Sequence, residues 1–313
     1  MRRWGFWGRI RWEVTLKPCT VSSPVGDAPS ESTLYYGGHV LDVLKALPED
    51  SIQVVCTTPP RWRSREPGDG PSPDRKPVVW DEGKSCRHSF SINADGQGWC
   101  GKCDAWKGHL GQEVTPHSYV HHLVEVFQEV RRVLSPDGIV WVHLRDAYAT
   151  HNRARGLKPK DLVGIPWRVA LAFQEDGWWV RQDIIWVPEH PRGEAASDRP
   201  QSSHEHVFLI TKNPQYHYDQ QEHEAGQCSV WSTSPEQRVE LMILAGTQGK
   251  GGSVLDPFSR DGLTGVVAQR CGCDFVGVDL DQKLLKVVEA RLLGRRPPKE
   301  PGPPEDLISE LFG

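Results

Sequence analysis

Residues 253–265 read SVLDPFSRDGLTG, and residues 275–279 read FVGVD. The apolar run 253–255 predicts a buried strand, a glycine-containing loop follows it, and a helix is expected to extend to about Arg270. Residues 275–278 predict a second strand that ends on Asp279. A strand, loop, helix and strand in this order form a βαβ unit, whose two strands lie parallel in one sheet.

The same alternation continues over most of the chain. In 116–134 the apolar residues recur at helical spacing, Thr115 can cap the first turn, and Pro136 to Gly138 follow the end. Strands that alternate with helices predict an α/β fold with a mostly parallel sheet. The other expected helices are 40–47, 166–173, 241–245 and 284–293, and the other expected strands are 52–56, 139–144, 178–186 and 205–211.

Length and composition predict the domain organisation. The 313 residues suit one large domain with an insertion. We expect an irregular basic and aromatic arm at 1–33, one domain at 34–293 and a Pro-rich tail at 294–313. Residues 61–112 are polar and rich in Gly, Pro and Cys, so we expect them to form an insertion outside the core. No apolar run reaches the roughly 18 residues of a membrane span, and the N-terminus lacks the apolar segment of a secretory signal.

Charge and aromatic content are compatible with nucleic-acid binding. The net charge of −4 excludes a chain that is basic all over, but local basic runs remain at 2–11, 61–65 and 153–160. The 13 tryptophans exceed what a chain of this size usually carries, and their rings can stack on unpaired bases, although we expect most of them in the core.

Four metal-ligand side chains lie within the expected insertion. They are Cys86, His88, Cys100 and Cys103. Without an export signal the cysteines should be reduced, so this cluster favours tetrahedral structural zinc over a disulfide. A metal ion would explain how a segment with few large apolar residues folds. A metal-free, reduced loop is the alternative.

Three predicted strand ends carry unusual residues, namely Thr58–Pro60, Asp256–Phe258 and Asp279. The strand at 52–56 runs into Thr57, Thr58, Pro59 and Pro60, where prolines leave carbonyl groups without local donors. Such a carbonyl and a threonine hydroxyl can accept both protons of an exocyclic amino group. The βαβ unit at 253–279 is typical of nucleoside binding, with Asp279 placed to bind a ribose diol. Both segments should meet at the carboxyl edge of the sheet, together with His143, Arg145 and Asp146, which end another strand.

These motifs resemble, in kind and in order, those of the β-type amino-group DNA methyltransferases. Those bacterial and phage enzymes methylate cytosine N4 or adenine N6. The resemblance implies a Rossmann-like S-adenosylmethionine-dependent methyltransferase fold, with helices on both faces of the sheet. The similar blocks are LYYGGHVLDVLKALPEDSIQVVCTTPP (34–60), GIPWRVALAFQEDGWWVRQDIIW (164–186), DRPQSSHEHVFLITK (198–212) and ILAGTQGKGGSVLDPF (243–258).

The resemblance also implies the reactants and the site. S-Adenosylmethionine would be the donor, and a base flipped out of double-stranded DNA would be the acceptor. Transfer to nitrogen would be direct, without a covalent nucleophile, and Thr in place of Asp favours cytosine N4. The residues expected to hold the target base are Thr58, Pro59, Pro60, Arg61 and Trp62. Those expected at the cofactor are Asp256, Phe258, Arg260, Asp261, Gly262, Thr264 and, at its ribose, Asp279.

Two positions depart from the family pattern. Arg61 stands where an aromatic residue usually follows Pro-Pro, and Arg260 stands where the loop usually has a glycine. Three hypotheses remain open. An ordinary methyltransferase tolerates both changes, with Trp62 or the Arg61 plane stacking on the base. Alternatively, the arginines hold the carboxylate of a carboxylated S-adenosylmethionine, giving a carboxymethylated base. In the third, the site has decayed and the protein only binds DNA.

The substrate and setting also follow only from the resemblance. The same fold can methylate small molecules or proteins, so DNA is an expectation that rests on the multi-block match. The resemblance implies a cytoplasmic enzyme of a bacterium or a phage-infected host, with no membrane partner and with a restriction system as its possible setting.

Overall fold

The computed structural model describes residues 19–20, 33–63, 77–80, 86–93, 96–103, 105–149, 157–189, 197–219, 228–247 and 251–281, with residues 284, 287, 288 and 291. The predicted arm at 1–33 and tail at 294–313 lie almost wholly outside this part of the chain. Among the described residues, no helix is long and apolar enough to cross a membrane.

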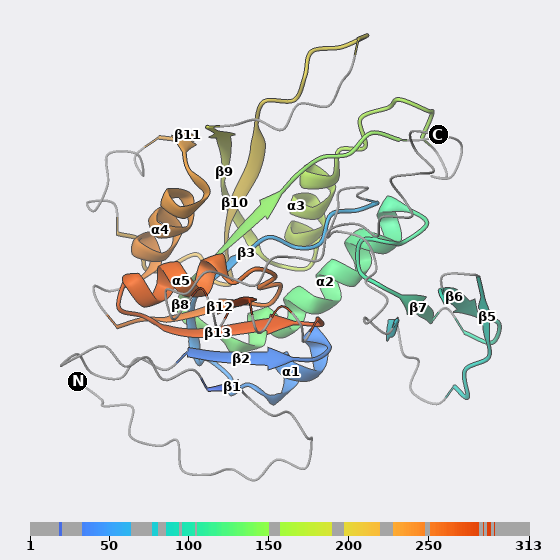
Figure 1. Cartoon of the computed structure of the whole chain (residues 1–313), viewed down its shortest axis with the longest axis horizontal. Coiled ribbons are helices and arrows are strands. Elements are labelled where there is room, and N and C mark those ends of the chain that lie inside the picture. The colour runs from blue at the N-terminus through green and yellow to red at the C-terminus, as the bar shows by residue number, and fades with distance from the viewer. Residues whose placement is uncertain are drawn as a thin grey trace.

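A mixed sheet organises the described part of the chain (Figure 1). Its nine strands run in the order β1-β2-β13-β12-β3-β8-β10-β9-β11. Strands β2, β13, β12, β3 and β8 are mutually parallel, whereas β10 is antiparallel to both of its neighbours. The predicted, mostly parallel α/β fold is therefore confirmed. The strands are β1 Cys19–Thr20, β2 Thr33–Gly37, β3 Ile52–Thr57, β8 Leu134–Leu144, β9 Trp179–Pro188, β10 Glu205–Thr211, β11 Val230–Thr233, β12 Ser253–Asp256 and β13 Asp274–Asp279.

Helices cover both faces of this sheet, as expected. Buried residues of α1, α2 and α3 belong to one hydrophobic cluster, and those of α4 and α5 belong to a second. Along β3, Val55 joins the first cluster while Val54 and Cys56 join the second, because successive strand side chains point to opposite faces. The helices are α1 Val40–Ala46, α2 Pro116–Val133, α3 Ile165–Glu175, α4 Pro235–Gly246 and α5 Leu263–Arg270. Residues 284, 287, 288 and 291 are also helical.

Two elements begin more than two residues away from the start that the sequence predicts. Strand β8 begins at Leu134, directly after α2, rather than at Ile139; a register shift against β3 accommodates the polar residues 135–138. Helix α4 begins six residues before the expected Leu241, because Ser234 and Gln237 form a capping box and Pro235 fits the first turn. The start of α2 is confirmed, since the Thr115 hydroxyl accepts from the Ser118 amide at 3.1 Å.

A small second sheet lies within the expected insertion. Its strands are β4 Val78–Trp80, β5 Phe90–Ile92, β6 Gly98–Cys100 and β7 Trp106–Gly108, all antiparallel in the order β4-β7-β6-β5. The expectation that 61–112 lies outside the core is wrong for part of it. The first hydrophobic cluster, which contains the buried residues of α1, α2 and α3, also includes Trp62, Trp80, Trp106 and Leu110. The segment is polar on average, so its composition did not indicate that these four apolar side chains are buried in the core.

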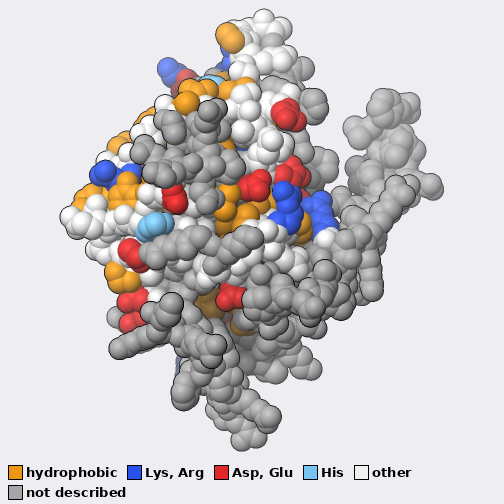
Figure 2. All heavy atoms as spheres, turned by 90° about the vertical axis from the view of Figure 1, so that its left-hand side faces the viewer, with side chains coloured by type: hydrophobic (Ala, Val, Ile, Leu, Met, Phe, Trp, Pro, Cys, Tyr) orange, Lys and Arg blue, Asp and Glu red, His pale blue; other side chains and the backbone are white. Residues whose placement is uncertain are grey.

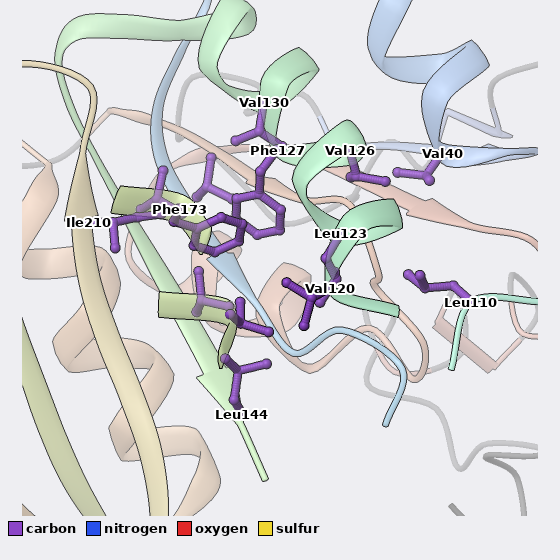
Figure 3. Packing of buried hydrophobic residues seen from close by; sticks show 14 of the residues in the cluster. Val40, Leu110, Val120, Leu123, Val126, Phe127, Val130, Leu144, Phe173 and Ile210 are labelled. Atoms are coloured by element: carbon purple, nitrogen blue, oxygen red, sulfur yellow. The ribbon is translucent and has the colours of Figure 1, made fainter. Parts of the chain in front are cut away.

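The first cluster should respond strongly to truncation at Phe127. Phe127 is fully buried, and its ring lies 4.5 Å from that of Phe173 between α2 and α3 (Figure 3). We expect Phe127→Ala to lower the free energy of unfolding in urea by about 3–5 kcal/mol, because a large cavity remains.

Leu171→Ala, on the exposed side of α3, is the matched control and should change it by less than about 0.5 kcal/mol. Equal losses in both variants would contradict this packing.

Candidate active site

A cavity of about 650 Å³ lies at the carboxyl ends of β3, β12 and β13. This volume falls within the range of about 300–1,000 Å³ that is usual for small-molecule sites. The two predicted segments do meet there. Of the residues expected from the sequence, those that line the cavity are Thr58, Pro59, Pro60, Arg61, Asp256, Phe258, Arg260, Asp261, Thr264 and Asp279. Gly262 and Trp62 do not line it.

Asp256 connects three elements at the floor of the cavity. Its carboxylate accepts hydrogen bonds from the hydroxyls of Thr57 at 2.8 Å and Thr264 at 2.7 Å, and from the Phe258 amide at 3.1 Å. The carboxylate is buried, and burial raises its pKa to about 6 although these three donors oppose the rise. Asp256 therefore ties the end of β3 to the loop after β12 and to the first turn of α5.

The loop after β12 keeps a glycine-like backbone at Arg260. Its φ is 44°, in the left-handed region, and Gly262 nearby has a φ of 75°. A side chain in this region costs roughly 1–2 kcal/mol, which explains why glycine suits the position. The Arg260 amide donates to the Asp279 carboxylate at 2.9 Å, and the Asp281 amide donates to its other oxygen at 2.7 Å. These two amides fix the orientation of the Asp279 carboxylate at the cavity.

The Thr58–Pro60 segment presents two acceptors. The Thr58 hydroxyl lies 3.1 Å from Nδ1 of His143. The Pro60 carbonyl accepts from the Tyr119 hydroxyl at 2.8 Å, whereas no described residue donates to the Pro59 carbonyl. Thr58 and Pro59 therefore both line the cavity, and their role as acceptors for an amino group stays a prediction.

Trp62 is placed differently from its sequence expectation. It is 4% exposed, and its indole Nε1 donates to the Glu113 carbonyl at 3.0 Å. Trp62 therefore anchors the segment after Pro60 in the core, and Arg61 is the residue after Pro-Pro that faces the cavity.

Thr58 contacts His143, which belongs to a buried network with Glu205 and Arg145. Nε2 of His143 contacts Glu205 at 2.5 Å, and Glu205 also pairs with Nε of Arg145 at 2.7 Å. Burial, with Arg238 and Arg61 adding to it, lowers the pKa of His143 to about 4. The imidazole is therefore neutral near pH 7. With Nε2–H donating to the Glu205 carboxylate, Nδ1 is an acceptor. Both the Thr58 hydroxyl and Nη1 of Arg238 lie 3.1 Å from this nitrogen, so they share it as donors.

Arg238 is a further member of the network around His143. This buried side chain of α4 lies over the Trp186 ring at 4.0 Å and contacts the His143 imidazole at 3.1 Å. Burial lowers the pKa of Arg238 to about 10, so it remains a cation. The sequence identified His143 and Arg145 but missed Glu205 and Arg238. Pairing of β10 with β8 brings Glu205 into place, and no local pattern in α4 indicated an inward arginine.

Asp146, also expected at this edge, has a structural role. Its carboxylate accepts from the amides of Gly164 and Ile165 at 3.1 and 2.9 Å, where α3 begins. The metal-ligand set Cys86, His88, Cys100 and Cys103 is brought together, but it lies away from the residues that line the cavity.

The comparisons with known proteins decide the family. A family model described as DNA methylase matches residues 52–290. Type II methyltransferase M.Cfr9I of Citrobacter freundii is 32% identical over 299 residues, covering 83% of this chain and 87% of the relative. M.SmaI of Serratia marcescens is 30% identical over 301 residues, covering 83% and 90%. This chain is a member of the N4/N6 DNA methyltransferase family.

Solved structures agree with the fold of this methyltransferase. The PvuII DNA methyltransferase, described as cytosine-N4-specific, has a TM-score of 0.59 at 17% identity and covers 90% of this chain and 91% of its own. A putative DNA modification methylase from Thermus thermophilus, solved with S-adenosyl-L-methionine, has a TM-score of 0.56 at 20% identity, covering 83% and 95%. S-Adenosylmethionine is the methyl donor of the family, and the methyltransferase acts on DNA.

Figure 2 shows the charged side chains of the described residues on one face of the methyltransferase. On the side of α4 and α5, acidic and basic side chains of the described residues lie intermixed (Figure 2). This agrees with the overall net charge of −4.

His143 should affect turnover more than donor binding. His143→Phe keeps the ring shape but removes the acceptor that orients the Thr58 hydroxyl, and misplacement of about 1 Å can cost about 10²-fold in rate. We expect kcat to fall by about that factor with little change in the KM for S-adenosylmethionine, measured by tritiated methyl transfer.

His117→Phe, exposed on α2, is the control and should behave as wild type. A loss confined to KM would contradict the positioning role.

His143 should also affect the pH dependence of stability. Its pKa is about 4 in the folded protein and 6.5 ordinarily, so the unfolded chain binds the proton more readily between these values. The contribution of neutral His143 is therefore complete above about pH 6.5 and is lost as pH falls toward about pH 4. Urea unfolding of wild type and His143→Phe should show a stability difference that shrinks over this range. A constant or growing difference would contradict the assignment.

Proposed function

We propose that this chain transfers the methyl group of S-adenosylmethionine to N4 of a cytosine flipped out of double-stranded DNA. The observation that carries the proposal is the pair of acceptors at Thr58 and Pro59, beside the cavity that contains Asp279. One amino hydrogen would donate to the Thr58 hydroxyl and the other to the Pro59 carbonyl. The nitrogen lone pair is then left to face the donor methyl.

The side chains favour direct transfer. The N–C bond forms as the bond from sulfur to the methyl carbon breaks, and the sulfur keeps that electron pair. Positive charge develops on the amino nitrogen, and the Thr58 and Pro59 oxygens stabilise it. His143 would not contact the amino group itself, because its Nδ1 faces the Thr58 hydroxyl. Positioning and acceptor placement therefore supply the catalysis, and the proton passes to solvent.

The donor would lie against the loop after β12. Asp279 would accept the ribose hydroxyls, and Phe258 would pack on the adenine. Asp256 and Thr264 would shape this subsite through their mutual hydrogen bond rather than by contacting the donor. Arg61 would stack its guanidinium plane on the flipped base, because Trp62 is withdrawn into the core.

Two observations favour cytosine N4 over adenine N6. Thr58 offers a neutral hydroxyl rather than a carboxylate. In addition, the PvuII enzyme, whose description states cytosine-N4 specificity, has the same fold. The relatives are type II methyltransferases, which supports a restriction-modification role for this chain.

A carboxylated donor is the second candidate. The observation in its favour is Arg260, whose exposed side chain stands at the donor loop despite a φ of 44°. Arg61, the other arginine of this hypothesis, also lines the cavity. The intact acceptor pair and the Asp256 hydrogen bonds favour an active enzyme over a protein that only binds DNA.

Product analysis tests both candidates. DNA of varied sequence is incubated with the protein and with each donor separately, and its nucleosides are analysed by mass spectrometry. We expect N4-methylcytosine with ordinary S-adenosylmethionine, and no product from Thr58→Val, which keeps the shape but loses the hydroxyl.

The other outcomes decide against the proposal. N6-methyladenine would overturn the choice of base. A carboxymethylated base that disappears in Arg260→Gly would establish the second candidate. Binding to DNA without any product would support the third hypothesis, in which the site has lost its activity and the protein only binds DNA.

A further inference from the structure

A compact group of sulfur and nitrogen atoms lies outside the active site, at the end of the small sheet. The ligand atoms of Cys86, His88, Cys100 and Cys103 all lie within 4.8 Å of one another. Cys86 Sγ is 3.8 Å from Cys100 Sγ, and Cys103 Sγ is 3.4 Å from His88 Nδ1. The four residues come from two separate segments, so only the fold brings them together.

The separations of 3.8 Å and 3.4 Å are close to those of tetrahedral ligands around one ion, and any pair near the 4.8 Å limit would move closer on binding. Bonds of about 2.3 Å to sulfur and about 2.0–2.1 Å to nitrogen give ligand separations of roughly 3.5–3.8 Å at tetrahedral angles. A disulfide requires sulfur atoms about 2.05 Å apart, well below the 3.8 Å between Cys86 and Cys100. The cysteines of the set are all free. The geometry therefore favours a shared ion over a covalent link.

The surrounding backbone also suits a thiolate ligand. The amides of Ser89 and Lys102 both donate to Cys100 Sγ at 3.5 Å. Amide donors aimed at a sulfur stabilise its negative charge, as outer-shell partners of metal ligands do. The His88 ring stacks on Phe90 at 5.3 Å, which fixes the orientation of the imidazole.

We propose that Cys86, His88, Cys100 and Cys103 bind one structural zinc ion. Three thiolates and one imidazole in a closed tetrahedron are a donor set of structural rather than catalytic zinc. The ion would hold together strands β5 and β6, which have only three residues each and carry the exposed side chains of Ile92 and Trp99.

The zinc-bound sheet would also support the catalytic segment. Trp80 and Trp106, from β4 and β7, both stack on the His122 ring of α2 at 5.0 and 5.3 Å. His122 contacts the buried Glu113 carboxylate at 2.9 Å, and that carboxylate accepts from the Gly111 amide at 2.8 Å. The sheet is therefore linked through packed side chains to the loop at Gly111.

Gly111 lies directly against the segment that follows Pro60. Its φ is 91°, and a Cβ there would lie 2.6 Å from the Arg61 carbonyl oxygen. Its own carbonyl accepts from the Arg63 amide. The zinc ion, acting through Trp106 and Glu113, would thus have a positioning role for Arg61 and take no part in methyl transfer.

Metal analysis of the full chain tests the proposal. Protein purified without chelators or metal-affinity resin should contain one zinc ion per chain, as measured by inductively coupled plasma mass spectrometry. Cys100→Ser and Cys103→Ser should lose it. Cys228→Ser, which alters an exposed free cysteine outside the set, is the matched control and should keep it.

A second measurement uses the wild-type chain, in case the variants fail to fold. A mercurial reagent should release the ion, as detected by a zinc-sensitive dye. Release should raise amide hydrogen exchange in 98–113 and leave α4 unchanged. Wild-type protein without zinc, a Cys86–Cys100 disulfide, or loss of zinc in Cys228→Ser would each overturn the site. If zinc release leaves amide hydrogen exchange unchanged in residues 109–113, the proposed link from the small sheet to Gly111 would be overturned.

Discussion

The buried carboxylate of Asp256 is the constraint on which the active site depends. An isolated carboxylate in this position would be costly, and the hydroxyls of Thr57 and Thr264 and the Phe258 amide satisfy it. These three donors come from β3, α5 and the loop after β12. Because the carboxylate can be satisfied only when all three are in place, it fixes the Thr57–Pro60 segment relative to the loop after β12. In the proposed reaction, Asp256 would thereby set the distance between the base and the donor without touching either of them.

The buried charges at the cavity have polar or charged partners. Glu205 stands between His143 and Arg145, and Arg238 lies against the same imidazole. Burial and the nearby cations keep His143 neutral, and a neutral imidazole with one nitrogen bound to Glu205 accepts at its other nitrogen. In the proposed reaction, this arrangement would leave the Thr58 hydroxyl able to accept from the amino group. Residues from β8, β10 and α4 would thus set the role of Thr58.

The small sheet shows how a polar segment can still contribute to the core. Two tryptophans from β4 and β7 stack on His122, whose partner Glu113 is buried and has its pKa raised by that burial. Glu113 in turn holds Gly111 and, through its carbonyl, Trp62. The small sheet is thus connected, through His122 and Glu113, to the segment that follows Pro60. The active site is supported from the main sheet on one side and from this smaller sheet on the other.

The sequence by itself determined the α/β class, the position of β3, β12 and β13, the start of α2, the family, and the two segments that meet at the cavity. It did so because strand and helix periodicities and the Thr-Pro-Pro and Asp-Pro-Phe segments are local patterns. Only the tertiary structure decided that Trp62 is withdrawn, that Glu205 and Arg238 join His143, and that Trp106 reaches α2. These contacts join residues far apart in the chain, and strand order and helix packing bring such residues together. No local pattern records which distant side chain will satisfy a buried polar group.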